Sequence, residues 1–269
     1  MDLLQKIEKQ TVTEDKLEIY FIGQSGYVLK TNNSTIYIDP YLSDYIENSE
    51  GLNESIMSRN YPPPFNPGMI SKCDAIICTH AHADHMDPWT LGRIKPKFQL
   101  YASIGSYEKS IINFPKSRVT FLTPQNPCHI SSFKIRSFPA AHYELWDENG
   151  RPDCLSILIQ WQDKLLFFWG DGIGYEGQID LLSSLNFNYF FAPINGRDIM
   201  REKMGIIGNI KRDELVTLCS KLSIEHIIPN HYDMFKNNTG AVVSFQGEVK
   251  ERDLNQSVIV MKCGDKIEL

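Results

Sequence analysis

The feature that most constrains this chain is the run Thr-His-Ala-His-Ala-Asp-His at residues 79–85. A short apolar segment, Ala75 to Thr79, leads directly into it and is predicted to be a strand, and loops held by strand ends are where binding groups concentrate. Imidazole and carboxylate ligands suit Zn, Mn or Fe. Three of the seven histidines within six positions are hard to place on an ordinary solvated loop. The predicted metal ligands here are His80, His82, Asp84 and His85.

Further ligands must come from elsewhere in the chain, because one loop cannot surround two ions. Three candidates each lie just after a short apolar segment that is predicted to be a strand: His142, Asp171 and His231. Glycines on both sides of Asp171 let backbone and metal approach closely. Alone, each candidate is more simply an ordinary hydrogen-bonded histidine or a turn aspartate. Together with the histidine-rich loop they form a coherent ligand set.

Short runs of β-branched and aromatic residues between turn residues predict a chain rich in strands. The clearest helix is Lys211 to Leu222, where apolar residues recur at helical spacing, and two more are predicted at Gly105 to Asn113 and Gln178 to Ser184. The Pro-rich stretch Gly51 to Ile70 is predicted to be a long loop that lines or covers something. The predicted strands are Leu17 to Ile22, Tyr27 to Lys30, Thr35 to Asp39, Ala75 to Thr79, Gln99 to Ala102, Arg118 to Leu122, Phe133 to Phe138, Leu155 to Trp161, Lys164 to Trp169, Tyr189 to Ala192, His226 to Pro229, Ser257 to Met261 and Lys266 to Glu268.

This mixture of hairpin-like strands with later helices predicts an α+β fold, with helices outside the sheets in an αββα arrangement. Because no linker, repeat or low-complexity tract interrupts the sequence, one domain over residues 1–269 is the simplest interpretation.

Composition narrows the function. A protein with a net charge of -6 repels the phosphate backbone of nucleic acids at long range, so no nucleic-acid partner is expected. The six cysteines contain no C-x-x-C pair and are predicted to be reduced and structural. No apolar run approaches the ~20 residues that span a bilayer, and the N-terminus has no signal-peptide core, so no membrane partner and a cytoplasmic location are expected.

The His-x-His-x-Asp-His loop, with the later His142, Asp171 and His231, resembles the metallo-β-lactamase fold superfamily. Within it, the chain most resembles the L-ascorbate-6-phosphate lactonase family. The likeness spans about residues 17–269. It is carried by Cys-Thr-His-Ala-His-Ala-Asp-His-Met-Asp at 78–87, Gly-Asp at 170–171, Pro-Ile-Asn-Gly-Arg-Asp at 193–198 and Ile-Pro-Asn-His-Tyr-Asp-Met-Phe at 228–235.

The resemblance implies an αββα sandwich with two divalent ions (Zn or Mn, with Fe also suited) at one edge of the two sheets. One ion would be held by His80, His82 and His142, and the other by Asp84, His85 and His231, with Asp171 bridging both. Asp84 would also be catalytic, by orienting the nucleophile or carrying its proton. The implied reaction is hydrolysis of a small anionic ester, first a sugar-phosphate lactone, by metal-activated water. Self-association into a homo-oligomer is implied as well.

Two other functions stay open. The run Gly-Asp-Gly-Ile-Gly-Tyr at 170–175 resembles the N-acyl-phosphatidylethanolamine phospholipase D branch, which implies a phosphodiesterase with an apolar acyl groove. The other hypothesis is a binding module that holds metal without catalysis, because a metal site does not guarantee turnover.

The substrate-binding candidates are Arg197, Arg201, Asn195 and Arg59, since guanidinium groups bind phosphate bidentately. A structural salt bridge is an equal alternative for each arginine. Asp233 is a candidate partner for a ligating histidine. His129 and His226 match no motif and are predicted to be structural. Tyr143, Tyr175 and Tyr232 flank predicted ligands and are candidate hydrogen-bond donors to an oxyanion.

Overall fold

The computed structural model describes residues 2–49, 57–142, 144–252 and 254–269. The chain divides into two compact units. Unit 1 comprises residues 1–122 and 261–269, and unit 2 comprises residues 123–260. The prediction of one domain over residues 1–269 stays a prediction.

Within its described residues, unit 1 contains a mixed seven-stranded sheet in the order β14-β1-β2-β3-β4-β5-β6. The pairs from β14 to β3 are antiparallel and those from β3 to β6 are parallel. The strands are β1 (Glu18–Gly23), β2 (Gly26–Lys30), β3 (Thr35–Ile38), β4 (Ala75–Ile77), β5 (Gln99–Ala102), β6 (Val119–Phe121) and β14 (Lys266–Glu268). The helices are α1 (Leu3–Lys9), α2 (Tyr45–Asn48), α3 (Pro88–Arg93) and α4 (Ile104–Lys109), with 3-10 turns η1 (Pro67–Met69) and η2 (Lys116–Arg118).

Unit 2 repeats this plan, with the order β13-β12-β11-β10-β9-β8-β7 among the strands described. The pairs from β7 to β10 are antiparallel and those from β10 to β13 are parallel. The strands are β7 (Cys128–Ile130), β8 (Phe133–Ala140), β9 (Cys154–Trp161), β10 (Lys164–Phe168), β11 (Asn186–Pro193), β12 (Ser223–Asn230) and β13 (Ser257–Val258). The helices are α5 (Gln178–Leu182), α6 (Ile199–Lys203), α7 (Arg212–Cys219) and α8 (Val242–Glu251).

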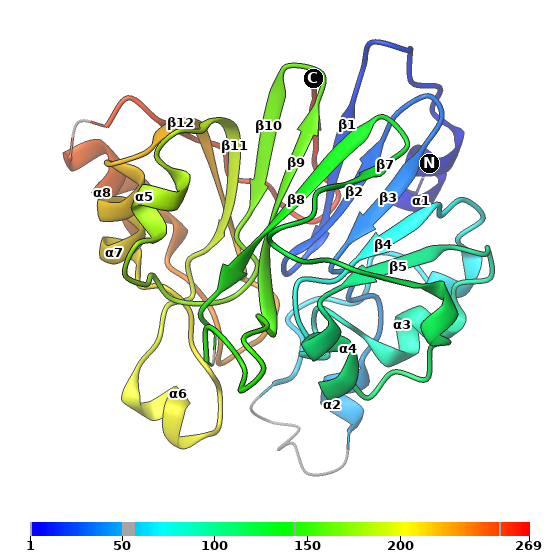
Figure 1. The fold of residues 1–269 in the computed structure, drawn as a ribbon, viewed down its shortest axis with the longest axis horizontal. Coiled ribbons are helices and arrows are strands. Elements are labelled where there is room, and N and C mark those ends of the chain that lie inside the picture. Colours follow the sequence, from blue (N-terminus) through cyan, green and yellow to red (C-terminus); the bar gives the residue numbers. More distant parts are fainter. Residues whose placement is uncertain (1, 50–56, 143, 253) are drawn as a thin grey trace. The chain divides into compact units, whose positions relative to one another are not determined.

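Each unit has an apolar core between its sheet and its helices. In unit 1, Leu4 and Ile7 of α1 and Leu91 of α3 belong to one buried cluster with alternate sheet residues such as Tyr37 and Ile76. In unit 2, α5, α7 and α8 lie on one side of the sheet (Figure 1). They pack against a cluster of aromatic strand residues, in which the rings of Phe167 and Phe190 stack at 4.9 Å. Burial of this apolar surface is the main stabilising contribution in each unit.

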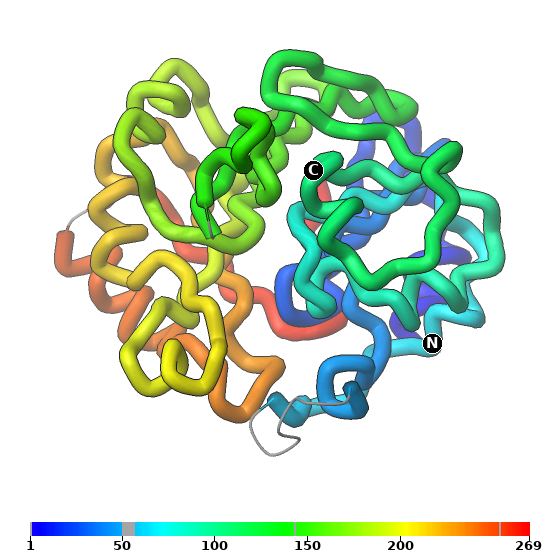
Figure 2. The backbone as a smooth tube through the Cα atoms, turned by 60° about the horizontal axis from the view of Figure 1, so that its bottom comes forward, coloured from blue at the N-terminus to red at the C-terminus, as the bar shows by residue number. Residues whose placement is uncertain are grey.

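The segment that carries α6, yellow in Figure 2, forms a separate loop after β11. Its base is closed where the Asn209 N–H donates to the Gly196 carbonyl at 3.0 Å. Asp198 caps the helix by accepting from the backbone N–H groups of Met200 and Arg201. This loop therefore has a fixed base.

The three predicted helices are confirmed as α4, α5 and α7, each shorter than predicted. The Pro-rich loop is confirmed where the structure describes it: Pro67 opens the short turn η1, while residues 51–56 lie outside the described residues. All six cysteines are free thiols, as predicted. Among the described residues, no helix combines the length and apolarity needed to cross a bilayer.

Candidate metal centre

In unit 1, the predicted ligand loop lies at the carboxyl end of β4. Its parallel neighbour β3 ends beside it, because parallel strands have their carboxyl ends at the same edge of a sheet. Asp39 directly follows β3, and the Asp39 N–H donates to the Ile77 carbonyl of β4 at 2.9 Å. The sheet thus places the Asp39 carboxylate under the loop that starts at Thr79.

Asp39 accepts three hydrogen bonds from this loop. Its Oδ1 accepts from the Thr79 N–H at 2.8 Å, and its Oδ2 accepts from Thr79 Oγ1 and from His85 Nδ1, each at 2.7 Å. The carboxylate is buried, and burying a charge costs several kcal/mol unless hydrogen bonds compensate it. Both carboxylate oxygens of Asp39 are therefore used to fix the loop in place.

The same network fixes the orientation of two predicted ligands. Because His85 Nδ1–H donates to Asp39, the lone pair of the neutral ring is on Nε2. The Thr79 hydroxyl donates to Asp39, so its oxygen accepts from His80 Nδ1 at 3.1 Å. The lone pair of His80 is then also on Nε2. Both imidazoles present the nitrogen that a metal ion requires.

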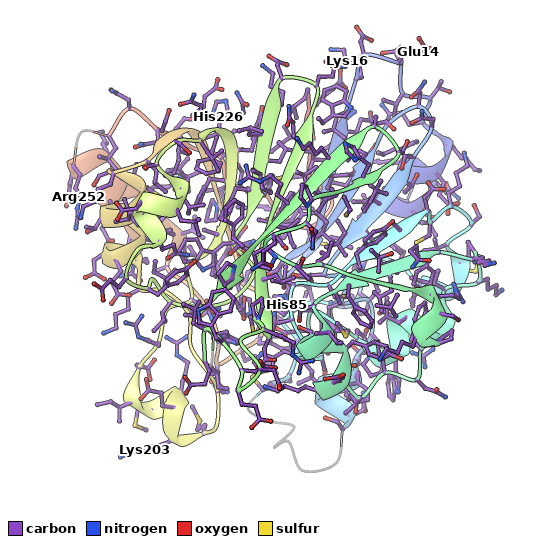
Figure 3. The ribbon with its side chains drawn as sticks, in the orientation of Figure 1. Glu14, Lys16, His85, Lys203, His226 and Arg252 are labelled. Carbon is purple, nitrogen blue, oxygen red and sulfur yellow. The ribbon has the colours of Figure 1, made fainter. Side chains whose placement is uncertain are left out.

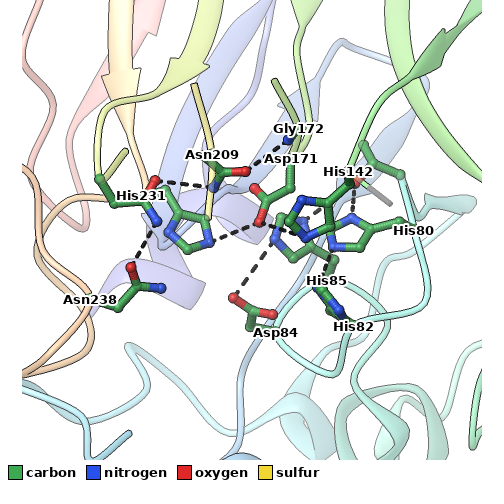
Figure 4. A network of polar contacts seen from close by, with 12 residues as sticks. His80, His82, Asp84, His85, His142, Asp171, Gly172, Asn209, His231 and Asn238 are labelled. Carbon is green, nitrogen blue, oxygen red and sulfur yellow. Dashed lines mark hydrogen bonds and ion pairs between the residues drawn. The ribbon is translucent and has the colours of Figure 1, made fainter. Parts of the chain in front are cut away.

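The four loop residues form two pairs of donor atoms. His80 Nε2 lies 2.9 Å from His82 Nδ1, and His85 Nε2 lies 3.7 Å from Asp84 Oδ2. Figure 4 shows His85 beside Asp84. The loop makes a tight turn, with the Met86 N–H donating to the His82 carbonyl at 2.7 Å. It then enters α3, which Asp87 caps by accepting from the Trp89 N–H.

Burial raises the pKa of Asp87, and hydrogen bonds from Thr90 and Ser43 partly offset this shift. Because Ser43 lies in the segment that follows β3, its hydrogen bond to Asp87 connects that segment to the end of the ligand loop.

In unit 2, the three remaining predicted ligands lie at one edge of the sheet. β8 and β10 run in the same direction because each is antiparallel to β9, and β11 and β12 are parallel to β10. The carboxyl ends of these strands therefore carry His142, Asp171 and His231 to the same edge. Asp171 Oδ2 lies 3.8 Å from His142 Nε2 and 3.3 Å from His231 Nε2.

Two backbone features bring these side chains together. A Cβ on Gly172 would lie 2.9 Å from the Ala141 carbonyl oxygen, so only glycine allows this approach of the Asp171 turn to the His142 strand end. His231 has a φ of 56°, a left-handed conformation that is uncommon for a non-glycine residue. Such conformations concentrate at functional sites.

A chain of buried amides supports the Asp171 turn. Asn209 Oδ1 accepts from the Gly172 N–H at 2.8 Å, as Figure 4 shows, and Asn209 Nδ2 donates to Asn195 Oδ1 at 3.0 Å. Asn195 Nδ2 in turn donates to Asn238 Oδ1 at 2.8 Å. Asn238 belongs to the loop after His231. The amides therefore connect the Asp171 turn to the His231 loop.

The predicted substrate-binding side chains all have partners within their own units. Arg201 donates to Asp198, to Asn238 and to the Asn195 carbonyl. Arg197 forms a two-pronged ion pair with Glu214, with both distances 2.7 Å. Arg59 donates to the carbonyls of Tyr61 and Ser43 and lies over the Tyr41 ring. These contacts agree with the alternative that the three arginines are structural and do not bind substrate.

The other candidates differ in their surroundings. Tyr175 donates to the Pro139 carbonyl at 3.0 Å, and burial raises its pKa to about 12. Tyr232 is buried and Asp233 is half-buried, directly after His231. Tyr143 lies outside the described residues. His129 is exposed, and His226, labelled in Figure 3, contacts Ser257 and Glu225.

The donor atoms fit a metal ion. Ligands bound to one ion at about 2.0–2.2 Å lie roughly 3–4 Å from each other, and the donor pairs within each unit lie between 2.9 and 3.8 Å apart. The separation of 3.8 Å between His142 and Asp171 is too long for a hydrogen bond. Imidazole and carboxylate donors suit Zn, Mn or Fe.

Three side chains near these ligands have no local signal in the sequence. Asp39, Gln24 and Asn209 reach the site from 37 to 60 positions away, through contacts with His85, Asp84 and Gly172. The position of Asp39 at the end of a predicted strand is the one signal that could have indicated it.

Comparison with known proteins places the chain in a family. Residues 18–231 match the family described as "Beta-lactamase superfamily domain", so the chain belongs to this family. This membership confirms the predicted metallo-β-lactamase fold.

Individual relatives are distant. A UPF0173 metal-dependent hydrolase of Myxococcus xanthus is 24% identical over 265 residues, covering 94% of this chain and 83% of the relative. An uncharacterized protein of Mycobacterium tuberculosis is 24% identical over 132 residues, 48% of this chain, and this match spans only 34% of the relative's length. The structure of a metallo hydrolase from Ignicoccus hospitalis matches with a TM-score of 0.66 and 18% identity, covering 94% of this chain and 98% of that one.

The role of Asp39 is tested by Asp39→Asn. Asparagine keeps the size of the side chain and tolerates the φ of 43° at this position, but it replaces an acceptor oxygen by an NH2 group. We expect the free energy of unfolding in urea to fall by about 1–3 kcal/mol and metal affinity in chelator competition to fall by about 10–100-fold. Asp74→Asn is the control, because Asp74 bonds the Thr35 N–H of the same sheet. Unchanged metal affinity in Asp39→Asn would contradict the assignment.

The role of the Arg197–Glu214 pair is tested by Glu214→Gln. Hydrogen bonding to Arg197 lowers the pKa of Glu214, so the pair stabilises the fold above the ordinary glutamate pKa, and this contribution is lost as pH falls through the lowered value. At neutral pH we expect a loss of about 0.5–1 kcal/mol, because the pair is partly exposed. Urea unfolding at a series of pH values should show the difference disappearing in acid. A pH-independent difference would contradict this role.

Proposed function

We propose that the chain is a metal-dependent hydrolase of a small anionic ester, with a sugar-phosphate lactone of the L-ascorbate 6-phosphate type as the first candidate. The observation that carries the proposal is the orientation of two histidine rings. Asp39 holds His85 directly and holds His80 through the Thr79 hydroxyl, which leaves the Nε2 lone pair of each ring available to a metal ion. The family and the name of the Myxococcus xanthus relative support hydrolysis as the reaction.

We assign the ligands to two divalent ions, Zn or Mn, with Fe also suited to the donors. In this proposal, one ion binds His80, His82 and His142, and the other binds Asp84, His85 and His231. Asp171 is the proposed bridge, because its Oδ2 lies within 4 Å of both His142 and His231 in unit 2.

Divalent ions bound there supply Lewis acidity toward the ester oxygen and activate water at neutral pH. The chain contributes the geometry. Asp84 is the proposed catalytic group: its carboxylate accepts a hydrogen bond from Gln24 and lies next to His85, where it can orient the attacking water and take up its proton. Asp233 remains a proposed partner of His231.

We propose that the candidate substrate-binding arginines fix the loops around the site and do not bind a phosphate directly. Arg197 lines a cavity of about 380 Å3 in unit 2, but Glu176, Asp213 and Glu214 line it too, so its charge does not favour an anion. We propose that Arg201 and Asn195 shape the site by fixing the loops around Asp171 and His231, and that Arg59 does so in unit 1. A small anionic substrate, no nucleic acid, no membrane and a homo-oligomeric state stay proposals.

A second candidate function is a phosphodiesterase with an apolar substrate group. A cavity of about 430 Å3 in unit 1 has Leu42, Pro63, Phe65 and Trp89 among its lining residues, with Arg93 stacked on Trp89 at 4.9 Å. Trp89 lies on α3, the helix that directly follows the ligand loop. Ser43, Asp44 and Asn66 also line this cavity, so it combines apolar and polar walls, as sites for small organic ligands do.

The test is turnover by protein reconstituted with Zn or Mn, using L-ascorbate 6-phosphate and an aryl phosphodiester as separate substrates. We expect metal-dependent turnover that falls by at least about 100-fold in His82→Ala, since even partners of ligands are worth 10–100-fold. His129→Ala is the matched control, because this histidine is exposed on β7. Full metal content and full activity in His82→Ala would contradict the ligand assignment.

The substrate decides between the candidates. Lactone opening alone favours the first candidate, and phosphodiester cleavage alone favours the second. Tight metal binding without turnover across a broad ester and phosphodiester panel would leave the non-catalytic binding module.

A further inference from the structure

The turn between β1 and β2 is strained at a position that is not a glycine. Gln24 has a φ of 56° and lies between Gly23, with a φ of 99°, and Ser25. A left-handed conformation is uncommon for glutamine, and residues held in such conformations persist only where surrounding structure enforces them. The Gln24 side chain is fully buried. The fold therefore keeps this amide at one defined place.

The Gln24 amide lies next to Asp84, the predicted catalytic aspartate. Gln24 Nε2 donates to Asp84 Oδ2 at 2.8 Å, across 60 positions of the sequence and within unit 1. The turn also packs on the residue that orients the ligand loop, because a Cβ on Gly26 would lie 3.1 Å from the Asp39 carbonyl oxygen. One turn thus contacts both Asp39 and Asp84.

The chemistry of the contact suits a cation site. The amide N–H restricts rotation of the Asp84 carboxylate, whose Oδ2 lies 3.7 Å from His85 Nε2. A lysine or arginine could donate the same hydrogen bond, but its positive charge would repel a metal ion nearby. A glutamine donates without adding charge.

We propose that Gln24 is a positioning residue for the metal ion that Asp84 and His85 bind, acting by fixing the Asp84 carboxylate. This inference rests on the proposed metal-dependent function, but it concerns a side chain that is not itself a ligand. The strain at φ 56° is the cost of placing a neutral donor there.

The alternative explanation is that Gln24 serves only the turn. Two variants separate the explanations. Gln24→Met keeps the length of the side chain and loses the donor. Gln24→Asn keeps an amide and suits a positive φ better than glutamine, but its side chain is shorter by one methylene and falls short of Asp84. A turn role predicts that asparagine restores the wild-type behaviour, whereas a positioning role predicts that it does not.

The experiment is a Co2+ titration of each apo-protein with chelator competition, followed by urea unfolding of the same samples. We expect Gln24→Met and Gln24→Asn both to bind one of two ions about 10–100-fold more weakly than wild type, while the affinity for the other ion is unchanged. Gln24→His, which offers a ring N–H at similar reach, should recover most of the affinity. In turnover, kcat should fall in the first two variants with little change in KM.

Wild-type metal affinity in Gln24→Met, or full recovery of affinity in Gln24→Asn, would overturn the inference and leave a turn role. The titration needs no substrate, so it separates this inference from the proposed reaction. An inactive wild type that binds two ions with the expected Gln24 dependence would overturn only the hydrolase proposal. A wild type that binds no Co2+ would overturn both.

Discussion

The arrangement of the ligand loop depends on one buried carboxylate, Asp39. Its three hydrogen bonds join the end of β3 to the loop after β4. They set the tautomer of His85 directly and that of His80 through the Thr79 hydroxyl. A buried charge of this kind is stable only when its acceptor sites are used, so the loop and the carboxylate hold each other in place. The Gln24 turn packs on the same residue.

In unit 2, asparagine amides and one arginine connect the loops that carry the candidate ligands. Asn209, Asn195 and Asn238 link the Asp171 turn to the loop after His231 through amide hydrogen bonds, and Arg201 binds the second and third of these residues. Buried polar networks rigidify a site when every member is satisfied. In both units the donors lie at the carboxyl ends of strands, where the sheet fixes the backbone and the following loop carries the side chains.

The candidate ligands could be predicted because their signal is local: His80 to His85 are adjacent in sequence, and His142, Asp171 and His231 each follow a recognisable strand. Asp39 and Gln24 could not, because their partners lie 40 to 60 positions away and only the β3–β4 pairing and the β1–β2 turn bring them together. The partner of Arg197, Glu214, lies 17 positions away on α7, and Arg201 reaches Asn238 across 37 positions, so neither contact has a local signal. Helix α8 was missed because Gly247 and Gln246 interrupt its apolar face, while tertiary packing of Phe245 and Val249 stabilises it.

We propose that two metal ions are bound by seven side chains: His80, His82, Asp84, His85, His142, Asp171 and His231. The most direct measurement is anomalous X-ray diffraction at the zinc edge, from crystals of the protein loaded with Zn. We expect two peaks about 3.5–4 Å apart. One peak should lie about 2.0–2.2 Å from ligand atoms of His80, His82 and His142, the other from those of Asp84, His85 and His231, with Asp171 reaching both. Zinc peaks at other positions, with none at these side chains, would contradict the two-metal proposal.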